Sequence, residues 1–97
     1  MGPGKARLLE QLQKTGSIAE AAERMGMSYM RAWKLIKTME RCFKQPLVEV
    51  KRGGAKGGGA ELTKAGKEVL ELYQRMEAES LRASRAAWHR MLKLLVR

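Results

Sequence analysis

The sequence contains few of the residues that form disulfides, metal sites and hydrolytic active sites. Cys42 is its only cysteine and His89 its only histidine among 97 residues. A single thiol excludes an intramolecular disulfide and would leave a zinc site without thiolate partners, so we expect no metal, no cofactor and a reducing cytoplasm. His89 lies in a basic helical stretch and is interpreted as a solvated or packed histidine.

Two further absences narrow the possible functions. The sequence has no uninterrupted apolar run of about 18 residues, so it predicts no membrane-spanning helix. The glycine-rich segment 53–59 lacks the Gly-Lys-Ser/Thr ending of a nucleotide-binding loop, and no carboxylate pair suggests acid–base catalysis. We therefore predict that the chain is not an enzyme.

Basic residues are abundant and unevenly distributed. The chain has 20 Lys and Arg against 10 acidic residues, and residues 28–56 hold eight basic and two acidic side chains. This excess predicts an anionic partner, for which double-stranded DNA is the leading candidate. With 44% hydrophobic and 31% charged residues, the chain is expected to fold as one small domain rather than to stay disordered.

The first half of the chain has the local signals of a helix-turn-helix. Short helices are predicted at 5–15 and 17–26 because apolar residues recur at helical spacing and glycines end both segments. Ser17 and Glu20 have the spacing of a capping box at the start of the second helix. A third, more basic helix is predicted at 28–43, with its apolar side, Phe43 included, in the core.

The second half predicts a β-hairpin and one long helix. Strand-forming residues at 47–50 and 60–62 flank a basic, glycine-rich loop, which we interpret as a DNA-contacting wing, with a plain linker as the alternative. The expected fold is mostly α with a small β-hairpin: a winged helix-turn-helix at 1–62, followed by a long dimerisation helix at 63–97. That helix would extend about 50 Å, too far for so small a domain to cover.

The exposed side of the third helix and the wing supply the candidate DNA contacts. Lysines there can meet guanine edges or phosphates, and aromatic side chains can contact thymine methyl groups. For Trp33 the alternative is packing against the wing or a neighbouring helix, and for Lys34 and Lys37 it is a solvated face. Backbone N–H groups at the start of the second helix can bind a phosphate. The candidates are Ser17, Ser28, Tyr29, Met30, Arg31, Trp33, Lys34, Lys37, Lys51, Arg52 and Lys56.

Apolar residues along the last helix supply a candidate dimer interface. Two alternatives remain for this stripe: a partner-protein surface, or a membrane surface, since residues 80–97 are basic and contain Trp88. We favour a homodimer without membrane attachment. The candidate interface residues are Val69, Leu72, Tyr73, Met76, Leu81, Trp88, Met91, Leu92 and Leu95.

Several short motifs occur in an order that identifies a family resemblance. They are Ala21-Ala22, Gly26-Met27-Ser28-Tyr29, Arg31-Ala32-Trp33, Pro46-Leu47-Val48, the Gly-Gly…Gly-Gly-Gly loop and Leu62-Thr63-x-x-Gly66. Over about Ala6 to Tyr73 the chain resembles the N-terminal DNA-binding domain of ModE-type molybdate-dependent transcriptional regulators. That domain is itself similar to the winged helix-turn-helix of LysR-type regulators.

The resemblance implies a homodimer, joined through its long helices, on a palindromic operator. We expect the chain to lack the molybdate-binding domain of ModE-type regulators and to give no direct molybdate response. The predicted function is therefore a sequence-specific DNA-binding transcriptional regulator. The alternative is a protein-interaction or nonspecific nucleic-acid-binding module that has lost operator reading.

Overall fold

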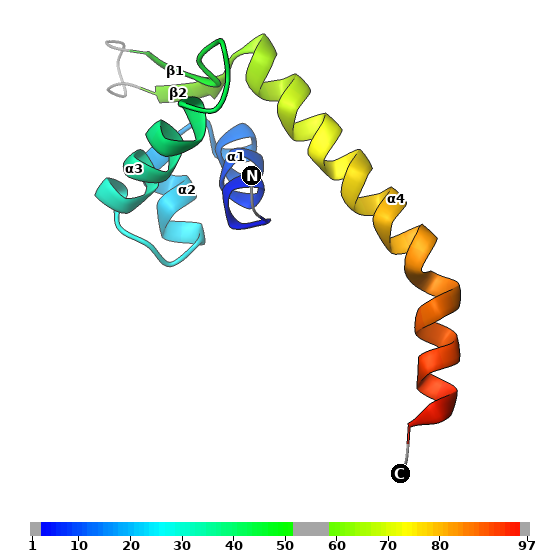
Figure 1. Ribbon diagram of the computed structural model, residues 1–97. Helices are drawn as coiled ribbons and strands as arrows, with labels where there is room; N and C mark the ends of the chain where they lie inside the picture. The colour runs from blue at the N-terminus through cyan, green and yellow to red at the C-terminus, as the bar shows by residue number, and fades with distance from the viewer. Residues whose placement is uncertain (1–2, 52–58, 96–97) are drawn as a thin grey trace.

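The chain folds as a small helical domain with a β-hairpin and a long final helix (Figure 1). The computed structural model describes residues 3–51 and 59–95. This architecture confirms the fold class predicted from the sequence. The elements are α1 (Pro3–Thr15), α2 (Ile18–Arg24), α3 (Tyr29–Glu40), β1 (Val48–Lys51), β2 (Gly59–Leu62) and α4 (Lys64–Leu94).

The first three helices and the hairpin share one hydrophobic core. Leu8, Leu9 and Leu12 have no exposed surface, as their spacing on one side of α1 predicts. Ala21 of α2 and Ala32 of α3 are also fully buried, and their small side chains allow the two helices to pack closely. The packing of α1, α2 and α3 therefore fixes which side of α3 remains outside.

Local hydrogen bonds set the helix boundaries. Gly16 and Gly26 have φ angles of 70° and 66°, the left-handed conformation that suits glycine after a helix. The Ser17 hydroxyl accepts from the N–H of Glu20 at 3.2 Å. In a complete capping box the Glu20 carboxylate would accept from the Ser17 N–H. Here the Ser17 N–H donates to the Thr15 hydroxyl instead, at 3.3 Å.

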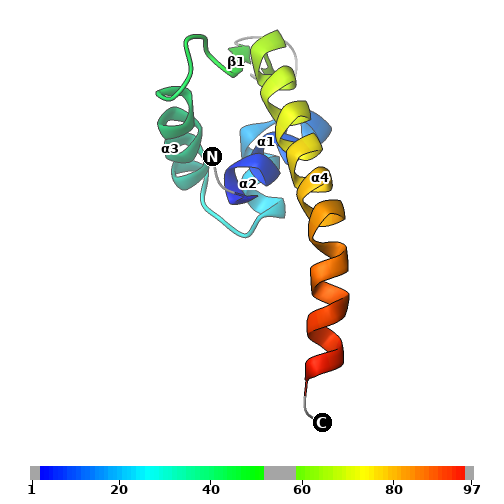
Figure 2. The same ribbon diagram turned by 45° about the vertical axis from the view of Figure 1, so that its right-hand side comes forward.

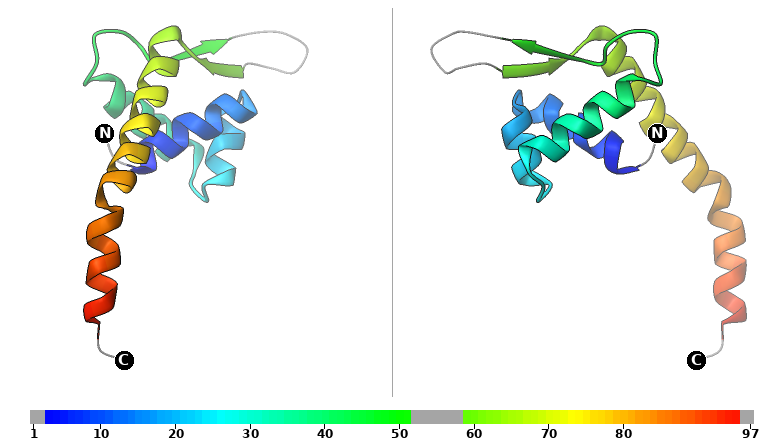
Figure 3. Two further views of the ribbon diagram at one scale, coloured as in Figure 1. Left: turned by 90° about the vertical axis from the view of Figure 1, so that its right-hand side faces the viewer. Right: turned by 60° about the vertical axis from the view of Figure 1, so that its left-hand side comes forward.

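The hairpin is attached to the helical core along its inner face. β1 and β2 pair antiparallel, with Val48 opposite Leu62 and both side chains buried. The N–H of Ala60 donates to the carbonyl of Gly16 at 2.9 Å, which ties β2 to the turn between α1 and α2. In Figure 3 the hairpin projects to one side of the helices, in the position of a wing.

One buried residue joins the hairpin to the last helix. Leu47 has no exposed surface, and its carbonyl accepts from the N–H of Thr63 at 2.9 Å. The Thr63 hydroxyl also donates to the Pro46 carbonyl at 2.7 Å and accepts from the N–H of Gly66 at 3.0 Å. A Cβ atom at residue 66 would collide with the Leu47 carbonyl, so this junction requires glycine.

Most of α4 extends away from the domain (Figure 2). The helix has 31 residues, which corresponds to about 46 Å. Its buried residues are Gly66 and Leu70, while Val69 and Tyr73 are partly buried against the same core. From residue 74 to residue 95 every side chain is exposed. The sequence analysis had not identified Leu70 as a core residue, and it assigned the neighbouring Val69 and Tyr73 to the dimer interface.

One core prediction was wrong. Phe43 was expected to lie inside the third helix and in the core, but α3 ends at Glu40 and the Phe43 side chain is 38% exposed. After Glu40 the chain turns back, so that the N–H of Leu47 reaches the Glu40 carboxylate. A helix that continued to Phe43 would carry the chain away from this contact. Phe43 lies instead beside α4, in an apolar groove with Val69 and Met76.

Candidate nucleic-acid interface

The exposed side of α3 begins at its capped N-terminus. The Ser28 hydroxyl accepts from the N–H of Arg31 at 3.1 Å, so this hydroxyl holds the first turn of the helix. Tyr29 and Met30 are 48% and 58% exposed, and Lys34 is exposed one turn further along. Arg31 is also exposed. The first two turns of α3 therefore present aromatic, thioether and cationic groups to solvent.

The side of α3 that carries Trp33, Lys37 and Glu40 is arranged differently. Trp33 is only partly exposed and packs against the core, and its predicted DNA contact stays a prediction. The ammonium of Lys37 lies 4.6 Å from the centroid of the Trp33 ring, within the range of a cation–π contact. The same ammonium is 3.5 Å from a carboxylate oxygen of Glu40. Lys37 is thus held by two neighbours on its own helix.

Glu40 is the functional candidate that the sequence analysis missed. Its Oε2 accepts from the N–H of Leu47 at 2.7 Å and from the N–H of Val48 at 3.0 Å. The carboxylate therefore connects the end of α3 to the start of β1. One signal was available, because an acidic residue in the last turn of a helix opposes the helix dipole and needs a reason to be there.

The N-terminus of α2 is a weaker candidate for phosphate binding. The Ser17 hydroxyl and N–H are both already hydrogen-bonded, to the N–H of Glu20 and to the Thr15 hydroxyl. The phosphate contact predicted at Ser17 stays a prediction that depends on the remaining N–H groups of this first turn.

The stem of the wing carries acidic as well as basic groups. Lys51 forms an ion pair with Glu61 at 3.0 Å, and hydrogen bonding to that carboxylate raises the pKa of the Lys51 ammonium. Glu49 lies directly opposite Glu61 in the hairpin register, which places two like charges side by side. The other two predicted wing contacts, Arg52 and Lys56, lie outside the described residues.

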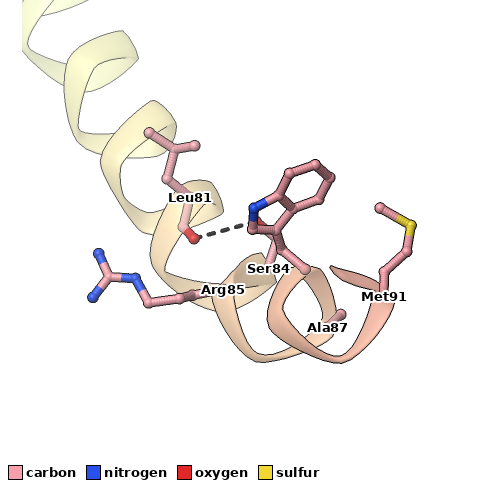
Figure 4. A pocket seen from close by; sticks show the side chains of 6 residues that line it. Leu81, Ser84, Arg85, Ala87 and Met91 are labelled. Carbon is pink, nitrogen blue, oxygen red and sulfur yellow. Dashed lines mark hydrogen bonds between the residues drawn. The ribbon is translucent and has the colours of Figure 1, made fainter. Parts of the chain in front are cut away.

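Seven of the nine predicted dimer residues line two apolar surfaces of α4, and the other two, Leu92 and Leu95, are exposed outside both. Near the domain, Val69, Leu72, Tyr73, Arg75 and Met76 line a groove with Phe43. Toward the C-terminus, a second open pocket runs along a single helix face (Figure 4). Its lining residues are Leu81, Ser84, Arg85, Ala87, Trp88 and Met91.

The distal apolar side chains of α4 are exposed to solvent. Trp88 is 53% exposed and Leu81 67% exposed, and Met91, Leu92 and Leu95 are exposed as well. So large an apolar surface on a small domain is typical of an interaction site.

Neither a metal-binding cluster nor a membrane-spanning helix is present in the described part of the chain. Residues 3–51 and 59–95 contain no group of three or more His, Cys, Asp or Glu side chains placed to hold a metal ion. Within the same part of the chain, no helix is long and apolar enough to cross a membrane.

The domain has three packed helices, and the last of them, α3, is capped at its N-terminus by Ser28. A hairpin lies beside these helices, and this arrangement defines a winged helix-turn-helix protein. The sequence matches the family described as bacterial regulatory helix-turn-helix protein, lysR family, over residues 4–67. The chain therefore belongs to the lysR family of bacterial regulatory helix-turn-helix proteins.

Individual relatives confirm the resemblance to ModE-type regulators. The chain is 44% identical over 71 residues to the transcriptional regulator ModE of Yersinia pestis, an alignment covering 73% of this chain and 27% of that protein. It is 39% identical over 83 residues to the molybdenum-pterin-binding protein MopA of Rhodobacter capsulatus, covering 86% of this chain and 31% of MopA. The chain thus spans about a third or less of the length of these relatives.

A solved structure has the same arrangement of elements. The CbnR DBD–DNA complex superposes with a TM-score of 0.69 at 27% identity, covering 90% of this chain and 98% of that one. The shared fold therefore includes the hairpin and part of the long final helix as well as the helix-turn-helix itself.

Proposed function

We propose that the chain is a sequence-specific regulator of transcription that binds double-stranded DNA. The observation that carries this proposal is the capped reading helix α3, whose first two turns expose Tyr29, Met30, Arg31 and Lys34 within a domain of the lysR family. In this motif the N-terminal part of the second helix enters the major groove, where such side chains can reach base edges. The similarity to CbnR in its DNA complex supports the same use here.

Two copies would read one operator. Residues 1–62 are proposed to bind DNA and residues 63–97 to join two protomers, acting in the cytoplasm. A two-fold dimer presents two α3 helices to half-sites about 34 Å apart on a palindrome. The exposed stripe of α4 supports this proposal, because burial against a second copy would remove it from water at about 25 cal/mol per Å².

The charges of α4 favour an antiparallel arrangement of the two helices. Residues 64–79 contain three basic and four acidic side chains, whereas residues 80–95 contain four basic and no acidic ones. Parallel helices would place the two basic halves together, while antiparallel helices would place each basic half beside a slightly acidic one. The same arrangement, centred near residue 80, would bring the Trp88 surface of one copy onto the Phe43 groove of the other.

Competition binding tests the DNA-reading part of this proposal. A site is first selected from random duplexes, and its affinity is then compared with that of unselected duplex at the same salt concentration. We expect specific binding to exceed nonspecific binding by about 10³-fold or more. Equal affinity for both would contradict the proposal and would favour a nonspecific nucleic-acid-binding module.

Sedimentation tests the assembly. We expect a homodimer at micromolar concentration, and a chain truncated after Tyr73 that is folded, monomeric and weaker on the selected site. A full-length monomer across that range would contradict the dimer and favour the partner-protein or membrane-surface interpretation of the stripe.

A further inference from the structure

The reading helix contains one fixed anion. The side chain of Glu40 is only 12% exposed, and its Oε2 accepts two backbone N–H bonds from Leu47 and Val48. Charge-assisted bonds of this kind are about twice as strong as neutral ones. They hold the carboxylate where it lies, so Glu40 cannot move away when the surroundings of α3 change.

Lys37 is the mobile partner of this anion. Its side chain is 49% exposed and reaches the other carboxylate oxygen of Glu40 at 3.5 Å while lying over Trp33 at 4.6 Å. Lys34, which lies one turn before Lys37 on the helix surface, is an exposed cation and repels the Lys37 ammonium toward the C-terminal end of α3, where Glu40 lies. The attraction of Glu40, the contact with the Trp33 ring and the repulsion from Lys34 together favour one position of Lys37 in the free protein.

We propose that Glu40 is a positioning residue that holds Lys37 across the Trp33 indole and away from the DNA backbone. This inference rests on the proposed DNA-binding function. A lysine that reaches a DNA phosphate binds it as a flexible point charge, without regard to sequence. Restraining it lowers the nonspecific affinity of α3 and leaves sequence discrimination to the first two turns of the helix.

A variant of Glu40 can remove the restraint while keeping the fold. In Glu40→Gln, the amide oxygen still accepts from the two backbone N–H groups, but the side chain no longer attracts Lys37. Glu40→Ala loses both functions and serves as the comparison for structural damage. Near-ultraviolet circular dichroism and thermal unfolding show which variants remain folded.

The first measurement is made on the free protein. Protons of the Lys37 side chain that lie over an indole ring are shifted upfield in NMR spectra. We expect this shift in the wild type, with Trp33→Leu as the reference without a ring, and we expect Glu40→Gln to reduce it toward that reference. An unchanged shift in the folded Glu40→Gln protein would show that Glu40 does not hold Lys37, and would overturn the proposal.

The second measurement is made on random duplex DNA. Glu40→Gln should raise the affinity about fivefold and steepen the salt dependence by about 0.9, because Lys37 becomes free to bind one phosphate. In a Lys37→Met background the same change should leave the salt dependence unaltered. An equal gain in both backgrounds would mean that only the lost negative charge matters, and would overturn the proposal.

Single lysine variants provide a test that does not require any change at Glu40. Lys37→Met should change the salt dependence on random duplex little, whereas loss of a lysine that contacts one phosphate flattens it by about 0.9. Flattening of that size by Lys37→Met would overturn the restraint. A wild type that prefers no duplex sequence would contradict the proposed regulator, yet the NMR and random-duplex measurements would still decide the role of Glu40.

Discussion

At the scale of single residues, the lysines of the proposed DNA-binding surface differ in whether a carboxylate holds them. Lys34 is exposed, while Lys37 and Lys51 are each paired with a carboxylate, Glu40 and Glu61. An ammonium that is paired with a carboxylate must break that ion pair before it binds a phosphate. Lysines of equal formal charge therefore contribute unequally to the free energy of DNA binding. Two predictions follow from this difference.

The first concerns Lys34. Replacing it with Ala should cost about 1–3 kcal/mol on the preferred site if its ammonium reads a base, and clearly less on random duplex. Fluorescence anisotropy with both duplexes at one salt concentration measures the two losses. Lys14→Ala, which removes the same charge from α1, is the matched control and should change neither affinity by much. Equal losses for Lys34→Ala on both duplexes would make it a phosphate contact.

The second concerns the wing. Glu61→Gln should return the pKa of Lys51 toward its usual value, because the hydrogen bond that raises it is weakened. The freed ammonium should strengthen binding to any duplex and steepen the salt dependence by about 0.9. Glu68→Gln on α4 changes net charge equally and serves as the control. If both variants behave alike, Lys51 does not reach the DNA backbone.

At the scale of elements, the junction of α3, β1 and α4 explains two of the sequence motifs. Leu47 donates to Glu40 and accepts from Thr63, and its carbonyl packs against the first turn of α4 at Gly66. The segments Pro46-Leu47-Val48 and Leu62-Thr63-x-x-Gly66 therefore meet in space. They orient the wing and the long helix relative to the reading helix.

Replacing Gly66 with Ala tests this junction. Alanine normally stabilises a helix interior by about 1 kcal/mol relative to glycine. Here the added methyl group meets a backbone carbonyl that is fixed by hydrogen bonds, so we expect a net loss of about 1–3 kcal/mol in the free energy of unfolding. Urea denaturation measures it. Gly4→Ala, where nothing lies within 4 Å of the new Cβ, should not destabilise.

At the scale of the whole molecule, the elongated shape bears on how two copies of the chain would assemble. The principal extents are 58, 30 and 21 Å, and the long dimension comes from the part of α4 beyond the domain (Figure 1). Residues 81–95 of that part expose most of the large apolar side chains of the helix. The proposed antiparallel dimer accounts for both the length and the exposure.

Cysteine cross-linking distinguishes the two helix orientations. In a chain whose natural thiol is removed by Cys42→Ser, Ser80→Cys should form an interprotomer disulfide on mild oxidation, because residue 80 lies at the proposed two-fold axis. Met76→Cys alone should form little, but mixed with Ser84→Cys it should cross-link efficiently. Efficient self-cross-linking at residues 76, 80 and 84 alike would indicate parallel helices instead.

The sequence by itself determined the order of the elements and most of their ends. Caps at Ser17, Ser28 and Thr63 and the left-handed glycines at 16 and 26 act within three or four residues, so the local pattern specifies them. The inner face of α1 was predictable for the same reason. The motif order likewise identified the family, because it samples the whole domain rather than one element.

The tertiary structure alone decided which charged groups are free and which apolar faces are used. Glu40 reaches Leu47 across seven residues, and the distance depends on where the intervening loop turns back. Lys51 meets Glu61 only once the hairpin register is set. In α4, apolar residues occupy more than one side of the helix. The first turn of α4 packs against the Leu47 backbone at Gly66, and this contact places Leu70, one turn later, in the core. Such contacts join residues distant in sequence, and their energies depend on packing that no local pattern records.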